Sequence, residues 1–415
     1  MKLYITLLRE SLVFALQALR VNRLRTVLSL LGVTIGIFAI ISVYTLVDSL
    51  ENNIKGSIES LGDNVIFVQK WPWTFGQDYP WWRYINRPLP DLDELHAIQK
   101  KSKYAQAACF MIGQSATAEY MDNAFEDIEL AAISYDYNRV KDLQLSRGRY
   151  FTISESEGGR PYCMIGSDIA DVLFGMVNPV GKTIEVKRQK MKVIGVFTRE
   201  GESFLGNSQD QQIYIPINFA RKFTDISSSR VNPFIMVKAL PGISNSQLID
   251  ELTGIMRSMR RLKPKSDDNF ALNQTSMLTN TFGKLFDVLG IAGSIIGFFS
   301  ILVGGFSIAN IMFVSVKERT GLIGIQKSLG AKNYFILFQF LSEAIFLCLL
   351  GGLIGLLVIY LLTVAINAST TFFVVLTLQN TLIGLGISIG IGTISGIWPA
   401  FSASRLDPVE AIRMN

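Results

Sequence analysis

Four long apolar stretches constrain the fold of this chain more than any other feature. Val27–Val47 and Val288–Val316 carry no charged residue, and Phe335–Ile366 is interrupted only by Glu343. A fourth apolar stretch covers residues 381–400. A helix that crosses the hydrocarbon core of a bilayer needs about 20 apolar residues. We therefore predict an α-helical membrane protein whose four transmembrane helices cover residues 27–47, 285–316, 335–366 and 381–400.

The composition agrees with a membrane protein. Of the 415 residues, 49% are hydrophobic and 18% are charged, whereas soluble domains carry about 25% charged residues. This much apolar surface excludes an intrinsically disordered chain. The chain also contains 34 glycines but only 12 prolines, and transmembrane helices contain glycine more often than soluble helices do.

The basic residues that flank the apolar stretches indicate the orientation. They lie in residues 1–26, in the loop 317–334 and in the tail 401–415, whereas the loop 367–380 has no charged residue. Cytoplasmic loops carry an excess of Lys and Arg. We therefore expect both termini and the loop 317–334 in the cytoplasm, and residues 48–284 on the other side of the membrane.

The segment before the first span has apolar residues at helical spacing, at Leu8, Leu12, Leu16 and Leu19. This spacing predicts a cytoplasmic amphipathic helix over residues 1–26 that lies on the membrane surface. The alternative is that the segment extends the first span. The apolar run that follows is too long for a cleavable signal peptide, so we expect the span to be retained.

The region 48–284 has the pattern of an α+β domain. Short runs rich in β-branched and aromatic residues predict strands at 64–69, 182–197, 212–217 and 234–239. Helices are expected at 91–102, where Asp91 and Glu94 form a capping-box pattern, and at 167–174 and 244–262. The segment Trp71–Pro90 is an aromatic loop. It either contacts a partner or ligand, or packs its own rings on the domain or at the membrane interface.

Glycines spaced four residues apart recur in the spans. Close approach of helix backbones supplies packing energy in lipid, so these pairs predict tight helix contacts, either within one chain or across a dimer. We expect a two-fold dimer whose contacts include Gly32, Gly36, Gly293 and Gly297. Glu343 is the intramembrane acid. It is a functional candidate, or it has a structural partner such as an arginine of the N-terminal helix.

The residue types for metal or nucleophilic chemistry are sparse. His96, Cys109, Cys163 and Cys348 have no metal-ligand spacing. The cysteines are either scattered buried residues, or Cys109 and Cys163 form one disulfide. Residues 175–183, GMVNPVGKT, resemble a phosphate-binding loop but have five residues between the glycines and precede a strand, so we interpret them as a turn. We expect no catalytic residue, no metal site and no cofactor in this chain.

The sequence around the loop 317–334 resembles that of a known family. Residues 317–355, KERTGLIGIQKSLGAKNYFILFQFLSEAIFLCLLGGLIG, are similar to the signature of the FtsX-like, or MacB-type, ABC transporter permeases. Residues 22–37, 178–196 and 399–413 resemble three further family phrases. Leu322 departs from the family, which usually has Glu before the IGI of this signature. The matching residues are Glu318, Arg319, Ile323, Gly324, Ile325, Lys327, Leu329, Gly330, Ala331, Gln339, Phe340, Leu341, Glu343, Gly351, Gly352 and Gly355.

The resemblance implies a multi-pass protein of the bacterial inner membrane that works as a homodimer or as a pseudo-dimer with a related permease. It implies one span, a large periplasmic domain and three further spans. In that domain the flanks 48–106 and 227–284 would form one subdomain, and 107–226 would be an inserted β-rich subdomain. A separate ABC subunit would bind ATP and Mg and act on the periplasmic domain by mechanotransmission.

The resemblance makes residues 317–334 the coupling segment, the part of the chain that contacts the ATPase subunit. The residues expected to serve this contact are Glu318, Arg319, Gly324, Lys327, Gly330 and Ala331. Efflux of a periplasmic substrate is the favoured function, with a possible periplasmic adaptor and outer-membrane duct as partners. The alternatives are an ATP-driven regulator of a periplasmic partner such as a cell-wall hydrolase, and a lipoprotein-release permease. Membrane lipids are expected partners and nucleic acid is not.

Overall fold

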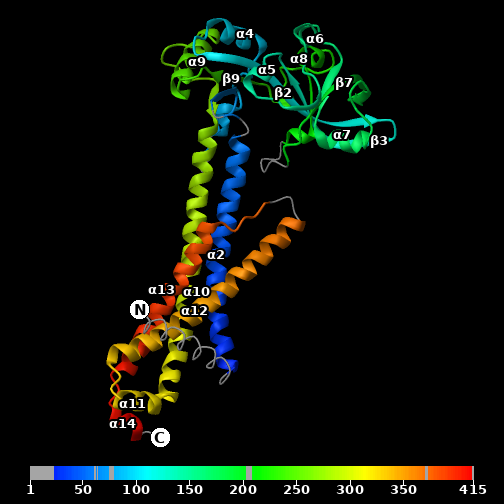
Figure 1. Cartoon of the computed structure of the whole chain (residues 1–415). Coiled ribbons are helices and arrows are strands. Elements are labelled where there is room, and N and C mark those ends of the chain that lie inside the picture. Colours follow the sequence, from blue (N-terminus) through cyan, green and yellow to red (C-terminus); the bar gives the residue numbers. More distant parts are fainter. Residues whose placement is uncertain are drawn as a thin grey trace. The chain divides into compact units, whose positions relative to one another are not determined.

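The computed structural model describes residues 23–59, 62, 64–73, 79–201, 208–369 and 373–413 (Figure 1). The chain divides into two compact units. Asn53–Gly283 forms the outer domain, and the chain before and after it forms the membrane unit. The predicted helix at 1–26 lies outside the described residues up to residue 22, and Arg23 already belongs to the first described helix.

The membrane unit is helical. It contains most of α2 (Arg23–Glu59) and of α10 (Thr275–Glu318), whose other ends belong to the outer domain. Its further elements are α11 (Thr320–Ser328), α12 (Asn333–Ser369), α13 (Leu378–Ser404) and α14 (Pro408–Arg413). Among the described residues, four of these helices, α2, α10, α12 and α13, are long and apolar enough to cross a membrane. This confirms the predicted four-span fold, with one span before the outer domain and three after it.

Glycines bring α12 against its neighbours. The Thr34 hydroxyl of α2 donates a hydrogen bond to the Gly351 carbonyl of α12 at 3.1 Å. A Cβ at Gly392 of α13 would lie 2.6 Å from the Ile345 Cα of α12, and one at Gly355 would lie 3.1 Å from the Thr34 carbonyl oxygen. The helix backbones therefore touch at these positions, as small residues allow in lipid.

The four glycines expected at a dimer contact are used inside the chain. A Cβ at Gly32 would lie 3.3 Å from the Ser307 hydroxyl oxygen, and one at Gly36 would lie 3.0 Å from the Ser300 carbonyl oxygen, both on α10. Gly293 and Gly297 of α10 face Val43 and Ile40 of α2 in the same way. The four glycines therefore pack α2 and α10 against each other, as the alternative of contacts within one chain expects, and the dimer stays a prediction.

The described residues of the outer domain contain one mixed sheet of ten strands. The strands are β1 (Val65–Gln69), β2 (Ala105–Tyr120), β3 (Asn123–Ile133), β4 (Leu145–Gly148), β5 (Tyr162–Ile165), β6 (Thr183–Val186), β7 (Gln189–Phe197), β8 (Gln212–Pro216), β9 (Phe234–Ala239) and β10 (Ala271–Gln274). Their order is β10-β1-β9-β2-β3-β8-β5-β7-β4, and β6 pairs with β2 and β7. Strands from the flanks 48–106 and 227–284 thus lie at one end of the sheet, and strands from residues 123–216 lie at the other end. The boundary expected at residue 107 falls inside β2, and the insertion itself stays a prediction.

Most of the predicted outer-domain elements are present. β1, β8 and β9 lie where strands were predicted, and residues 182–197 form the hairpin β6–β7. The predicted helices are α4 (Leu92–Lys101), α7 (Ser167–Phe174) and α9 (Asn245–Met259). The capping box of Asp91 and Glu94 is confirmed. The turn before a strand at 175–183 is also confirmed, because Gly175 ends α7 and Thr183 begins β6.

Helices cover both faces of the sheet. α4, α7, α8 (Ile217–Ala220) and α9 pack on one face with residues such as Ile66 and Phe110. The short helix α5 (Tyr137–Val140) and Phe151 pack on the other, which contains Phe67 and Cys109. Cys163 belongs to the first face. The three cysteines are buried and free, so the disulfide alternative is wrong and the buried-residue interpretation holds.

The glycines of α13 allow a matched test of helix packing. Gly392→Ala places a methyl group against the backbone of Ile345, whereas a Cβ at Gly390 meets no atom within 4 Å. Overpacking of this kind typically costs about 1–3 kcal/mol. We expect Gly392→Ala to lower the thermal unfolding midpoint of the detergent-purified chain, followed by circular dichroism, and Gly390→Ala to leave it unchanged. Equal midpoints for the two variants would contradict the close α12–α13 contact.

Candidate functional site: the coupling segment

The intramembrane acid Glu343 is paired within the membrane unit. Its side chain is 2% exposed, and the Arg319 guanidinium, in the turn between α10 and α11, donates a hydrogen bond to its carboxylate at 3.2 Å. A buried carboxylate needs such a partner because desolvation of an unpaired charge is costly. Among the described residues, the partner of Glu343 is therefore Arg319 and not an arginine of the N-terminal helix.

Lys327 also has an internal role. Its ammonium group donates hydrogen bonds to the carbonyl oxygens of Ser404 at 2.9 Å and Leu406 at 2.6 Å. These carbonyls lie at the carboxyl end of α13, where a helix leaves its last carbonyls without intrahelical partners and a cation is favourable. Lys327 therefore fastens α11 to the end of α13.

Gly324 is the contact point between α11 and α14. A Cβ at this position would lie 2.9 Å from the Ala411 Cβ and 3.2 Å from the Pro408 carbonyl oxygen. The absence of a side chain thus lets the two helices pack directly. The structure buries Gly324 under α14, and its expected part in the contact with the ATPase subunit stays a prediction.

Gly330 ends α11. Its φ is +97°, and a Cβ there would meet no atom within 4 Å. The amide of Ala331 donates to the Gln326 carbonyl oxygen at 3.0 Å, as in a glycine-terminated helix. Gly330 is therefore required by its backbone conformation, so a bulky substitution there strains the chain as well as changing the surface. Ala331 packs against the core of the membrane unit, and Glu318 is exposed at the end of α10.

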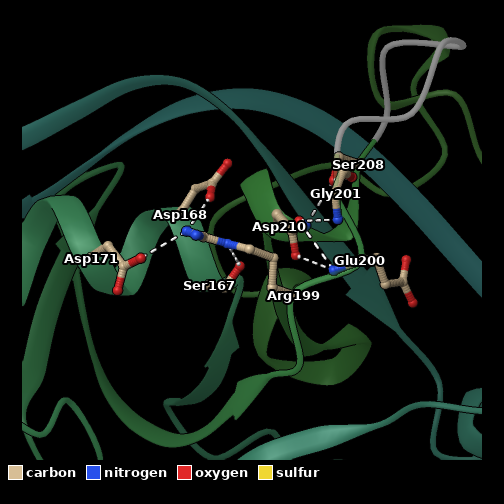
Figure 2. A network of polar contacts seen from close by, with 8 residues as sticks. All are labelled: Ser167, Asp168, Asp171, Arg199, Glu200, Gly201, Ser208 and Asp210. Atoms are coloured by element: carbon tan, nitrogen blue, oxygen red, sulfur yellow. Dashed lines mark hydrogen bonds and ion pairs between the residues drawn. The ribbon is translucent and has the colours of Figure 1, made fainter. Parts of the chain in front are cut away.

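The outer domain contains a separate polar network around residues 199–210 (Figure 2). The carboxylate of Asp210, 2% exposed, accepts hydrogen bonds from the backbone N–H groups of Glu200 at 3.1 Å and Gly201 at 2.7 Å. The exposed Arg199 binds Asp168 and Asp171 of α7 at 2.9 and 2.7 Å. The network joins the end of β7 to α7 and to the short helix η1 (Gln209–Gln211), and we assign it a structural role.

An open polar groove lies on β2, β3 and β8, with Glu129 and Gln212 in its lining. The Gln212 amide donates to the Glu129 carboxylate at 2.8 Å, and the Tyr214 hydroxyl donates to Gln212. A Cβ at Gly113 would lie 2.5 Å from the other Glu129 oxygen. Burial raises the pKa of Glu129, opposed by the hydrogen bond from Gln212 and by Lys141.

Part of the aromatic loop Trp71–Pro90 packs on its own domain. The Trp73 ring lies 4.9 Å from that of Phe67, and the Tyr79 and Tyr84 rings are 5.3 Å apart. The side chains of Trp81 and Trp82, on the short helix α3 (Trp81–Tyr84), are 55% and 59% exposed. Self-packing therefore accounts for several of the rings, and these two tryptophans remain on the surface.

Comparison with known families agrees with this architecture. The model of the MacB-like periplasmic core domain matches residues 26–255, and that of the FtsX-like permease C-terminal region matches residues 294–408. The first match covers more than half of the chain and the second contains the coupling segment. The chain therefore belongs to the MacB/FtsX-type ABC permeases, and it is a multi-pass membrane protein with a periplasmic-type α+β domain.

Curated relatives match along nearly the whole chain. The macrolide export ATP-binding/permease protein MacB of Syntrophobacter fumaroxidans is 27% identical, over 98% of this chain and 64% of its own length. The probable syringafactin export ATP-binding/permease protein SyfD of Pseudomonas syringae is 30% identical, over 98% of this chain and 59% of its own length. The chain thus spans about three-fifths of the length of the curated relatives it matches.

Two solved structures are similar to about half of this chain. The periplasmic region of MacB from Actinobacillus actinomycetemcomitans has a TM-score of 0.44 and 19% identity, and covers 55% of this chain and 95% of its own. The extracellular domain of the ABC-type transporter YknZ from Gram-positive bacteria has a TM-score of 0.38 and 21% identity. It covers 50% of this chain and 99% of its own length.

The contacts of Lys327 predict a local effect of its removal. Hydrogen bonds to charged groups contribute about 1.5–3 kcal/mol. We expect Lys327→Met to speed amide hydrogen exchange at the end of α13 and in α14 by roughly tenfold to a hundredfold. The exposed Lys332 provides the matched control, and Lys332→Met should leave both regions as protected as in the original chain. Unchanged exchange in the Lys327 variant would contradict the fastening role.

The raised pKa of Glu129 predicts a pH-dependent stability. A carboxyl whose folded-state pKa lies above its unfolded value stabilises the fold in acid, and this contribution is lost as the pH rises through the folded pKa. Glu129→Gln keeps an oxygen for the Gln212 amide and removes the charge. We expect it to raise the unfolding midpoint more at about pH 8 than at about pH 5.

Tryptophan fluorescence can follow this transition, because all tryptophans except Trp398 lie in the outer domain. The exposed Glu126 supplies the control variant Glu126→Gln, for which the midpoint should change equally little at both pH values. If Glu129→Gln raised the unfolding midpoint equally at both pH values, the Glu129 carboxyl of the original chain would ionise as easily in the folded protein as in the unfolded chain.

Proposed function

We propose that this chain is the permease subunit of an ABC-type transporter that couples ATP binding and hydrolysis by a separate ATPase to movement of its periplasmic domain. The observation that carries the proposal is the attachment of the coupling segment. Arg319 binds Glu343 of α12, Lys327 binds the end of α13, and Gly324 packs on α14. A segment held at three points can pass a displacement to the helices that hold it.

The helix α10 supports the second step of this mechanism. It begins at Thr275, directly after β10, and continues without interruption to Glu318 at the start of the coupling segment. One helix thus links the strand at the edge of the outer sheet to the proposed ATPase contact. A packed helix moves as a rigid element, so a displacement of one end of α10 is transmitted to its other end. ATP and Mg would be bound by the ATPase subunit.

The proposed orientation follows from the distribution of basic residues. Both termini and the coupling segment would lie in the cytoplasm, and the outer domain in the periplasm of a bacterial cell. A dimer with a second copy or a related permease would use faces other than those of Gly32 and Gly36, which α10 covers.

Export is the transport function that we favour. The relatives described above have names that assign macrolide export and syringafactin export to them. We propose that this chain likewise serves efflux of a periplasmic substrate, with a periplasmic adaptor and an outer-membrane duct as further partners. Control of a cell-wall hydrolase and release of lipoproteins are less favoured, because neither is in the names of these relatives.

The proposal predicts where ATP turnover occurs. The purified chain in nanodiscs, supplied with ATP and Mg, should show no turnover above that of empty nanodiscs. Addition of its ATP-binding subunit should produce turnover that differs from that of the subunit alone. Metal-dependent hydrolysis by the isolated chain would contradict the proposal, and so would an ATP-binding subunit whose turnover is the same with and without the chain.

A further inference from the structure

The polar groove on β2, β3 and β8 has the size of a small-ligand site. Its volume is about 370 Å³, which lies within the range of pockets that bind small molecules. The sheet changes from apolar to polar at this place, because Tyr214 belongs to the apolar core of this face whereas Gln212 lines the groove. Ser115, Glu129 and Gln212 stand opposite one another on the three neighbouring strands. They therefore form one polar row across the sheet.

The carboxylate of Glu129 is accessible from the groove through one of its oxygens. Its Oε2 atom accepts the hydrogen bond from the Gln212 amide, whereas Oε1 has no donor among the described residues. The backbone of Gly113 is not in the left-handed region, so its conformation does not require glycine, yet a Cβ there would lie 2.5 Å from Oε1. The missing side chain thus leaves space beside Oε1. Burial raises the pKa of Glu129, and the Gln212 hydrogen bond and Lys141 oppose this only in part, so an added cation would favour the ionised carboxylate.

The groove contains charges of both signs that do not neutralise one another. Asp127 and Glu129 contribute carboxylates, and Arg230 contributes a guanidinium. Within the described ranges of the chain, Asp127 accepts a hydrogen bond from the Ser115 hydroxyl at 2.6 Å, and the Arg230 guanidinium has no acceptor. A ligand that carries both a cation and an anion would satisfy these groups together.

Hydrogen bonds within the domain hold the walls of the groove. The Ser208 hydroxyl donates to the Gly201 carbonyl oxygen at 2.7 Å and accepts from the Asp210 backbone N–H at 3.2 Å (Figure 2). The Gln114 side chain accepts a hydrogen bond from the Lys187 ammonium group at 2.6 Å. Groups that are fixed before binding lose less conformational entropy when a ligand enters. The groove is therefore organised in advance for a small polar ligand.

We propose that this groove binds a small zwitterion, an amino acid or a short peptide, whose ammonium group contacts Glu129 and Asp127 and whose carboxylate contacts Arg230. Guanidinium and carboxylate groups form paired, charge-assisted hydrogen bonds, which makes Arg230 a specific anchor for the carboxylate. The inference goes beyond the proposed function, because it assigns a ligand to the outer domain whether or not that ligand is exported.

Isothermal titration calorimetry on the full chain in nanodiscs, without an ATP-binding subunit, tests the class of ligand. The probes are alanine, dialanine and trialanine, each also in an N-acetylated form without the ammonium group and in a C-amidated form without the carboxylate. We expect at least one zwitterionic probe to bind. Both of its capped forms should bind roughly tenfold to a hundredfold more weakly, because each loses a charged hydrogen bond.

The same titrations separate the two sources of the zwitterion. Tightest binding of alanine would identify a free amino acid as the ligand, and tightest binding of a longer probe would identify a peptide. The absence of saturable heat with all three zwitterions would overturn the inference. Capped forms that bind as tightly as the uncapped probe would also overturn it.

Matched variants locate the binding in this groove. Glu129→Gln and Arg230→Gln should each weaken the zwitterion about tenfold or more, whereas Glu126→Gln, at an exposed carboxylate of β3 outside the groove lining, should not. Gly113→Ala should also weaken it, because the methyl group fills the space beside Oε1 of Glu129. Gly254→Ala, where an added Cβ meets no atom within 4 Å, is the control for this change.

A double-mutant cycle shows which charge of the ligand each residue contacts. The N-acetylated probe should bind the Glu129→Gln variant as tightly as the original chain, because the partner of Glu129 is already absent from this probe. The C-amidated probe should likewise not distinguish Arg230→Gln from the original chain. Tryptophan fluorescence during thermal unfolding checks that each variant is folded. Full affinity for the zwitterion in both charge variants would place the ligand elsewhere and overturn the inference.

Discussion

The ion pair between Arg319 and Glu343 is the interaction on which the arrangement of the coupling segment depends. A carboxylate that is 2% exposed within an apolar helix is stable only with a cation beside it. Arg319 can reach Glu343 only if the chain turns at the end of α10 and brings the start of α11 against α12. Once α11 begins there, Gly324 meets α14 and Lys327 reaches the end of α13. The three contacts lie along one short helix and therefore act together.

These contacts give a structural reason for three residues of the family signature in this chain. Gly324, Lys327 and Gly330 match the signature, and each is explained by the chain's own structure: a helix crossing, a bond to helix-end carbonyls and a positive φ. The large side chains exposed on α11 are Leu322 and Ile325, and Leu322 is the position at which the sequence departs from the family. A leucine at this place enlarges an apolar face that a glutamate would interrupt.

The sequence predicted the features that depend on local patterns. Long apolar runs were sufficient for the four spans, and the capping box of Asp91 and Glu94 located α4. The strands β2 and β3 were not predicted, because their residues include many alanines and few β-branched side chains, and their stability comes from pairing with β9 and β8. The partners of Gly32 and Lys327 lie far along the chain, so no local pattern could show whether a glycine faces its own chain or a second copy.

The continuity of the sheet limits how the outer domain can respond to force. β2 pairs with β9 through residues 105–111 and with β3 through residues 111–120, so it joins the two ends of the sheet without a break. A hinge at the expected boundary would have to break several adjacent backbone hydrogen bonds, each of which contributes about 0.5–1.5 kcal/mol. Under the proposed function, the outer domain would therefore pass on motion by tilting or twisting as a whole, and not by closing two lobes on each other.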